Sequence, residues 1–358
     1  MPHDETRFDL GFNSNYSFDF SGGNLSPGGG LLQQGKFLHK VALLALALSR
    51  FPRTDRRIHR AVKILLQQIY SRISGRHVDS AVKYLKADDI LTRLLGKDAL
   101  ASQASISHFF NNLDGEDITK LQELLQQLFL MANPPGSDSS FILDIDIKLL
   151  DAYGAQKESS FNAHYPANGY LPLLFLSAET GYLLSLQLPS ESVSSVKGIR
   201  DFLEPTFQWM RKTYGDIPIL LRGESGFAFN ELYLVCEEYK ISYNIELKSS
   251  GKLRDQLRGV QDEAWKKLAE ELAADIDAFK EMRAELQAEA TRLFIEKYGY
   301  YNEENKTIEE HYEVMYQAKS WSKARRVVCC ITREVGQFTP ECMFTVTSPG
   351  TLPDGASP

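Results

Sequence analysis

The chain has few cysteines, and none is spaced to hold a metal. Its 358 residues include four cysteines, Cys236, Cys329, Cys330 and Cys342, with no CxxC pair and no paired histidines beside them. Such a pattern is typical of reduced thiols in a cytoplasm, and it argues against a disulfide framework or a zinc finger. We therefore expect a cytoplasmic protein.

Long apolar runs and a secretory leader are also missing. The most apolar run, residues 41–48, is far shorter than the roughly 20 residues that a membrane-spanning helix needs. The first 30 residues are rich in Asn, Ser, Phe and Gly, and they contain neither a charged leader segment nor a cleavable apolar stretch. We expect a mobile arm over residues 1–30 and no membrane partner.

An overall excess of positive charge is absent too. The formal net charge of -7 argues against a uniformly basic nucleic-acid binder. A local excess exists, however, because Asp55 is the only acid between Lys36 and Arg72. Basic side chains in this stretch are candidates for contacts with DNA phosphates; the arginines concerned are Arg50, Arg53, Arg56, Arg57 and Arg60. The alternative is a cationic helix face with no role in nucleic-acid binding.

Helical spacing of apolar residues fills the first third of the chain. From residue 31 to residue 132 apolar positions recur three or four apart, and Gly and Pro are sparse. We expect an all-α domain here, and its basic stretch makes it the candidate DNA-binding domain. Within it, residues 101–111 offer several side chains that could cap a helix.

Strand-like runs begin after a turn-rich linker at residues 133–140. The pattern predicts strands at residues 141–146, 170–177, 182–188, 217–221 and 242–246, with helices at residues 196–214 and 230–239. A short turn at residues 179–181 predicts a hairpin. This order indicates an α/β fold, an RNase H-like mixed sheet with flanking helices, over residues 141–348.

A helical insertion is predicted to interrupt this domain at about residues 252–310. Its composition shifts to Ala, Glu, Lys, Leu and Arg, with acids and bases often three or four apart, which is typical of a long, solvated helix. Strand-like pattern returns at residues 312–317, 326–332 and 343–347. Residues 349–358 are rich in Pro and Gly, and we expect a disordered tail there.

Two of the predicted strands deliver a carboxylate where the apolar run stops. These are Asp146 and Glu224, and Asp144 shares a strand face with Asp146 because side chains alternate with period two. Carboxylates from separate elements are the ligands that Mg²⁺ takes, leaving room for phosphate. The alternative is that these acids are surface caps or members of salt bridges.

Arg222 and Trp321 each allow two interpretations. Arg222 could contact phosphate near a metal, which adds it to the candidate DNA-binding residues, or it could pair with Asp144 or Glu224. Trp321 could stack on a base, but aromatic side chains of this kind are more often core anchors, and we expect it in the core.

Many segments together resemble the DDE transposases of bacterial insertion sequences, specifically the group called DDE domain group 1. Upstream segments carrying the resemblance are residues 70–75, 84–89 and 100–107. In the catalytic half they are residues 143–146, 153–156, 169–174, 219–222 and 225–227, followed by 316–322, 325–328 and 344–347. The resemblance runs over nearly the whole chain in consistent order.

This resemblance implies cut-and-paste transposition, with metal-dependent DNA strand cleavage and strand transfer. Asp146 corresponds to the first catalytic carboxylate and Glu224 to the second, with Mg²⁺ as cofactor and Mn²⁺ as a substitute. The implied partners are the terminal inverted repeats of the element and its target DNA. A homodimer is expected because two DNA ends are joined.

Three departures from the family pattern predict impaired or absent activity. After Asp146 the family has a small hydroxyl pair, whereas this chain has Ile147 and Lys148, and the Lys148 amine could compete with the metal for Asp146. Glu224 stands where the family has Asp. The family's third catalytic Glu lies on a helix beyond the strand at residues 344–347, so the chain is expected to be truncated before it. Glu334 and Glu341 lie in the wrong segment to replace it.

Three functions therefore compete. The first is an Mg²⁺-dependent DNA transposase with two of its three acids. The second is a non-catalytic remnant that binds DNA or a full-length transposase. The third, a metal-dependent nuclease with another substrate, would need a third ligand of its own.

Overall fold

The computed structural model describes residues 8–9, 17–18, 28–50, 61–86, 89–136, 140–152, 159–162, 167–188, 198–272, 292, 299–302, 307–334 and 340–348. They belong to two compact units, Met1–Pro134 and Pro135–Pro358. Within these ranges every helix is too short or too polar to cross a bilayer.

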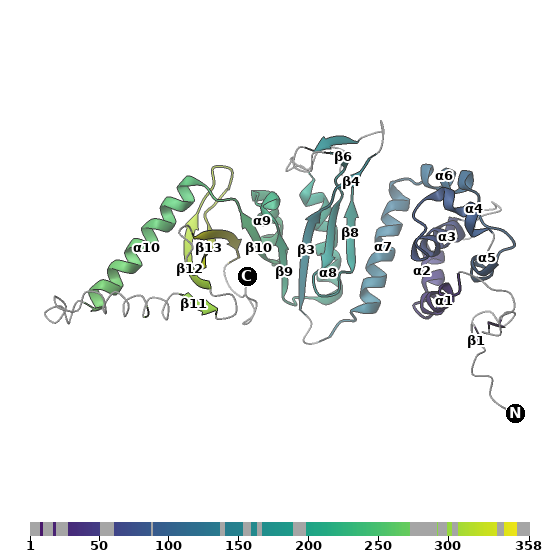
Figure 1. The fold of residues 1–358 in the computed structure, drawn as a ribbon, viewed down its shortest axis with the longest axis horizontal. Coiled ribbons are helices and arrows are strands. Elements are labelled where there is room, and N and C mark those ends of the chain that lie inside the picture. Colours follow the sequence, from purple (N-terminus) through teal and green to yellow (C-terminus); the bar gives the residue numbers. More distant parts are fainter. Residues whose placement is uncertain are drawn as a thin grey trace, which may run out of the picture. The chain divides into compact units, whose positions relative to one another are not determined.

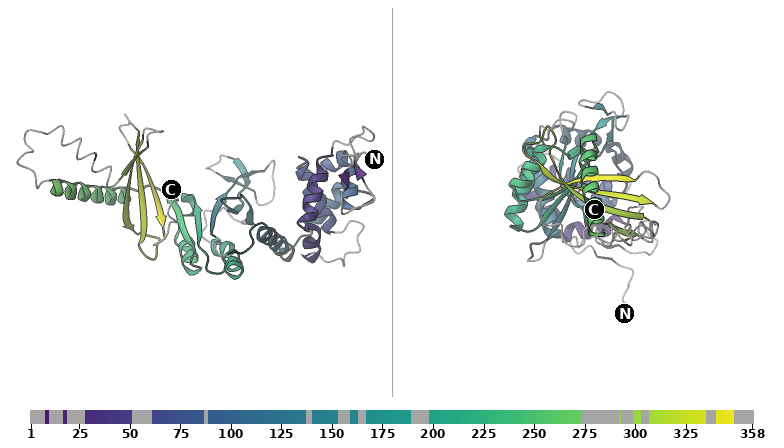
Figure 2. Two further views of the ribbon diagram at one scale, coloured as in Figure 1. Left: turned by 90° about the horizontal axis from the view of Figure 1, so that it is seen from below. Right: turned by 90° about the vertical axis from the view of Figure 1, so that its left-hand side faces the viewer.

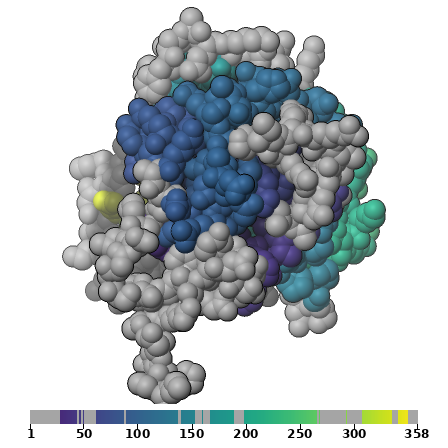
Figure 3. Space-filling view, turned by 90° about the vertical axis from the view of Figure 1, so that its right-hand side faces the viewer, coloured from purple at the N-terminus to yellow at the C-terminus, as the bar shows by residue number. Residues whose placement is uncertain are grey.

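Beyond residue 28, the regular structure described in the first unit consists of helices. Its helices are α1 (Leu31–Lys40), α2 (Leu43–Arg50), α3 (Ala61–Ile73), α4 (Val82–Leu85), α5 (Asp89–Leu95), α6 (Gln103–Asn111) and α7 (Gly115–Ala132). Figure 3 views this unit from one side, with the region of α3 to α6 in blue. Before them, β1 (Phe8–Asp9) and β2 (Ser17–Phe18) pair antiparallel inside the predicted arm.

Capping side chains set the ends of α6 and α7. The Ser105 N–H donates to Ser102 Oγ over 3.2 Å, and the Asp117 N–H donates to Asp114 Oδ1 over 2.9 Å. Each cap satisfies a backbone donor that the first turn of a helix leaves without an intrahelical partner. The predicted cap in residues 101–111 is therefore Ser102.

The second unit is built on one mixed sheet (Figure 1). Among the described residues it has nine strands in the order β11-β12-β13-β14-β10-β9-β3-β7-β8. The first five in chain order are β3 (Phe141–Ile147), β7 (Leu173–Ser177), β8 (Leu183–Gln187), β9 (Ile219–Gly223) and β10 (Ser242–Leu247). β3, β9 and β10 run parallel, and β7 and β8 continue antiparallel from β3. This confirms the predicted RNase H-like sheet.

Antiparallel strands extend this sheet beyond β10. They are β11 (Gly299–Asn302), β12 (Thr307–Tyr316), β13 (Arg325–Glu334) and β14 (Glu341–Thr347), and they appear as yellow-green arrows in the left view of Figure 2. The predicted helical insertion contains α10 (Gly251–Leu272). Strands, not helices, occupy its last part, because β11 and the start of β12 lie before residue 310. β11 pairs with β12, and β12 pairs with β13, and local composition does not reveal these pairings.

A separate small sheet follows β3. It consists of β4 (Leu150–Asp151), β6 (Ala167–Tyr170) and β5 (Ser160–Asn162), in that order. Residues 153–158, which carry part of the family resemblance, lie outside the described residues.

Apolar side chains of the main sheet are covered by helices on one face. Phe175 of β7 packs edge-on against Phe202 and Phe207 of α8 (Ile199–Tyr214), and Tyr243 of β10 packs against Tyr233 of α9 (Asn230–Glu238). α10 packs on β12 of the same sheet. Residues of alternate register, including the predicted site acids, therefore project from the other face.

A buried arginine joins β13 to α9. The Arg325 side chain is 2% exposed, lies over the rings of Tyr233 and Trp321, and donates to Glu237 Oε1 over 3.1 Å. Trp321 is itself buried, which confirms the expectation that it is a core residue. The extension strands are thus tied to α9 by a desolvated ion pair as well as by apolar packing.

Candidate catalytic site

The register of two parallel strands brings the predicted catalytic acids together. Ile145 of β3 pairs with Gly223 of β9, and the next residue on each chain is Asp146 and Glu224 respectively. Neighbouring strands lie about 4.8 Å apart. The two carboxylates therefore emerge side by side at the carboxyl edge of the sheet, and both residues are exposed.

Neither carboxylate is held by an ion pair within the described residues. Asp146 Oδ1 accepts a hydrogen bond from the Ile147 N–H over 2.7 Å. Glu224 precedes a short 3-10 helix, Ser225–Phe227, and its carbonyl accepts from the Phe227 N–H over 3.0 Å. These backbone contacts orient the two residues and leave carboxylate oxygens accessible to a cation.

Asp144, the third predicted metal ligand, is engaged differently. Arg222 donates to both of its carboxylate oxygens, over 2.8 Å and 3.0 Å. Hydrogen bonding to Asp144 raises the pKa of Arg222 above its usual value. Of the partners left open for Arg222, the structure selects Asp144. The pair is partly exposed, so it contributes only about 0–1 kcal/mol, and a cation could displace it.

In the described part of the chain no ion pair joins Lys148 to Asp146, and residues 51–60 of the basic stretch lie outside that part. The Lys148 side chain is exposed. Arg50 ends α2, with its side chain outside the described atoms. The other four predicted DNA contacts lie outside the described residues altogether: Arg53, Arg56, Arg57 and Arg60.

A second group of potential metal ligands, which the sequence did not predict, lies on β12 and β13. Among the described residues, ligand atoms of Glu309, His311 and Cys330 all lie within 4.8 Å of one another, on β12 and β13. Their signal is absent from the linear sequence because His311 and Cys330 are far apart along the chain. Only the pairing of β12 with β13 joins them.

Gly223, which precedes Glu224, gives a test of the strand packing at this site. A Cβ at this position would lie 2.8 Å from Ile145 Cγ2 and 3.2 Å from Ile245 Cδ1. Gly223→Ala is expected to lower the free energy of unfolding by about 1–3 kcal/mol, because the β-branched Ile145 cannot move aside easily. Urea unfolding measures the change.

Gly259→Ala is the matched control for that substitution. Gly259 lies inside α10, and a Cβ there meets no atom within 4 Å. Alanine should stabilise this helix by about 0.5–1 kcal/mol. Equal effects of the two substitutions would show that β9 is not packed as described.

Comparison with known proteins identifies the family. The family model for "Transposase DDE domain group 1" matches residues 8–355. The chain belongs to this family. No curated protein matches the sequence of this DDE transposase-family chain.

A solved structure is also similar to it. The cryo-EM structure of a piggyBac transposase synaptic complex with hairpin DNA matches with 10% sequence identity and a TM-score of 0.33. The match covers 87% of this chain and 52% of the piggyBac chain. The transposase-family chain thus spans about half the length of that solved chain.

Membership of the DDE family implies a requirement for a divalent metal. The donors at the strand ends fit such an ion, because Asp146 and Glu224 offer carboxylate oxygens without a competing ion pair among the described residues. Asp144 could join them only by giving up its contacts with Arg222.

Proposed function

We propose that this transposase-family chain catalyses metal-dependent DNA strand cleavage and strand transfer for an insertion sequence, at a rate lowered by its altered site. The observation that carries the proposal is the adjacency of Asp146 and Glu224 at the ends of β3 and β9. Both are hard oxygen donors, which suits Mg²⁺ with Mn²⁺ as a substitute. Bound metal would activate the attacking oxygen and stabilise the leaving one.

In this proposal the acids bind the metal and Arg222 contacts the DNA phosphate. Asp146 and Glu224 hold the cation and so fix where a DNA phosphate can lie. Arg222, freed from Asp144, is long enough to place its guanidinium near a phosphate oxygen, where bidentate hydrogen bonds are favourable. Without DNA, Arg222 and Asp144 hold each other, so the metal or the phosphate would have to displace this weak pair before either group could act.

The DNA partners follow from the same proposal. We propose that the chain binds the element's terminal inverted repeats and target DNA, using Arg50, Arg53, Arg56, Arg57 and Arg60 for phosphate contacts, and that it works as a homodimer in the cytoplasm. Phosphate contacts of this kind weaken with salt, since counterions are released on binding.

A second candidate function is a non-catalytic relative that binds DNA or a full-length transposase. One observation favours it: among the described residues, no third carboxylate completes a three-ligand group with Asp146 and Glu224. DNA binding is compatible with both candidates. They differ only in whether strands are cut.

Glu224→Asp separates the two candidates. Aspartate is one methylene shorter, which moves the carboxylate by about an ångström, and reacting geometry is sensitive to displacements of this size. We expect weak cleavage by the unchanged chain and at least about tenfold faster cleavage by Glu224→Asp. The assay uses DNA carrying the inverted repeats, with Mg²⁺ or Mn²⁺, and denaturing gels.

Salt-dependent DNA binding by both proteins controls for folding. Absence of cleavage by both proteins, with binding intact, would exclude the catalytic proposal in favour of the non-catalytic one. Cleavage that persists in excess chelator would contradict metal dependence.

A further inference from the structure

The outer strands β12 and β13 form a ladder of ten residue pairs with two different faces. One face is apolar: Tyr312 and Val314 are buried where α10 packs on β12. The other face carries Glu309 and His311 of β12 and Cys330 of β13, all partly buried. Alternation of side chains along the strands separates the two sets.

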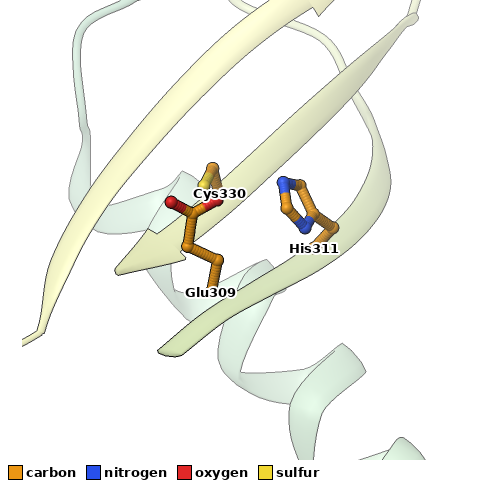
Figure 4. Close-up of side chains that lie close together, drawn as sticks. All are labelled: Glu309, His311 and Cys330. Atoms are coloured by element: carbon orange, nitrogen blue, oxygen red, sulfur yellow. The ribbon is translucent and has the colours of Figure 1, made fainter. Parts of the chain in front are cut away.

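Strand register brings the three side chains into one group. His311 is directly opposite Cys330, and Glu309 lies two residues before His311 on the same face. Cross-strand neighbours have Cβ atoms about 4.5–5.5 Å apart, so their side-chain ends can converge. The carboxylate, imidazole and thiol ligand atoms lie within 4.8 Å of one another (Figure 4).

The glutamates of β12 differ in their partners, and this difference also singles out Glu309. Glu310 pairs with Arg333 over 3.5 Å, and Glu313 accepts from Arg326 Nε over 2.9 Å. Within the described residues no such ion pair is found for Glu309, which instead lies beside His311 and Cys330. The Glu309 carboxylate thus lies within reach of the same imidazole and thiol.

We propose that Glu309, His311 and Cys330 form a binding site for one divalent cation of the Zn²⁺ class. Thiolate and imidazole ligands select Zn²⁺ over Mg²⁺, which prefers oxygen alone. Zn²⁺ bonds of about 2.0–2.3 Å in tetrahedral geometry put ligand atoms about 3.4–3.7 Å apart, so small side-chain rotations close the site. Water takes the fourth position, and the thiol proton passes to solvent.

Occupancy of this site would cross-link β12 and β13. The bond network would join residues that are distant in the chain, at the part of the sheet against which α10 packs. Metal binding of this kind adds directly to folding stability, because the unfolded chain has no preformed site. The site is thus a structural clamp on the sheet extension.

Metal binding by the purified full chain tests the proposal. The chain is stripped with chelator and titrated with Zn²⁺ against a chromophoric chelator, and it is then loaded with Co²⁺. We expect one Zn²⁺ per chain at the site and a thiolate-to-cobalt charge-transfer band. His311→Ala and Cys330→Ser should each weaken Zn²⁺ binding by more than about 100-fold, since even outer-sphere partners are worth 10–100-fold.

Matched variants exclude other sources of binding. Cys342→Ser removes an exposed thiol of β14, which pairs with Ile331 and so belongs to the opposite face, and it should leave Zn²⁺ affinity and the cobalt band unchanged. Asp146→Asn, at the proposed catalytic site, should also leave the cobalt band unchanged. This outcome separates the two metal sites, because only one contains sulfur.

Thermal unfolding provides a readout independent of affinity. Zn²⁺ should raise the Tm of the unchanged chain and of Cys342→Ser, but not that of Cys330→Ser or His311→Gln, with circular dichroism confirming that each variant folds. Absence of a thiolate band, or equal Zn²⁺ affinity in the unchanged chain and Cys330→Ser, would overturn the proposal.

Discussion

Asp146→Asn is expected to weaken Mn²⁺ binding at the strand ends by at least about 10–100-fold and to remove any strand cleavage. Asparagine keeps the size of aspartate and its hydrogen bond with the Ile147 N–H, but it has no charge. Hard divalent cations depend on carboxylate oxygens, and this substitution removes one of the two carboxylates at the strand ends, leaving Glu224 there. Loss of free Mn²⁺ signal in electron paramagnetic resonance measures binding.

A control at the opposite end of the neighbouring strand, β9, makes the result specific. Asp216 lies just before β9 and pairs with Lys240 over 3.1 Å, with both side chains 74% exposed. Asp216→Asn should leave Mn²⁺ binding and cleavage unchanged. Unaltered Mn²⁺ binding in Asp146→Asn would remove Asp146 from the metal site, whatever the level of cleavage.

Glu237→Gln should destabilise the second unit by about 2–3 kcal/mol. This substitution leaves the Arg325 charge buried without a counter-ion, and breaking a fully buried pair costs about 3–5 kcal/mol. A smaller value is expected because 25% of the Glu237 side chain is exposed. Glu237 also accepts from Lys323 over 2.8 Å and from the Tyr243 hydroxyl over 3.0 Å.

The neighbouring Glu238 is the matched control. It pairs with Arg200 over 2.9 Å, and 54% of its side chain is exposed. Exposed pairs contribute about 0–1 kcal/mol, so Glu238→Gln should change the free energy of unfolding by no more than that. Urea unfolding of both variants gives the comparison, and equal small effects would show that Arg325 does not depend on Glu237.

The pH dependence of unfolding gives a second readout of the same pair. Burial opposes the charge on Glu237, but contacts with Lys323, Arg325 and Tyr243 outweigh burial and hold its pKa below its usual value of 4.5. The folded state thus favours the ionised carboxylate. Its contribution to stability is present above pH 4.5 and is lost as the pH falls through the lower folded pKa. Glu237→Gln should lack this part of the profile.

The sequence by itself determined the fold class and the order of most elements. Apolar periodicity is local information, and it predicted β3, β9, β10 and the helices between them within a few residues. The end of a strand is local too, so Asp146 and Glu224 could be singled out before their neighbours were known. The predicted insertion ran too far because the pairing of β11 with β12, and of β12 with β13, is not visible in the local composition.

Tertiary structure alone decided which side chains meet. The parallel register of β3 and β9 sets Asp146 beside Glu224 and pairs Arg222 with Asp144 instead of Glu224. The antiparallel register of β12 and β13 sets His311 opposite Cys330. The physical reason is that strand pairing is nonlocal: a shift by one residue would turn every side chain to the other face, and packing of the whole sheet fixes that choice.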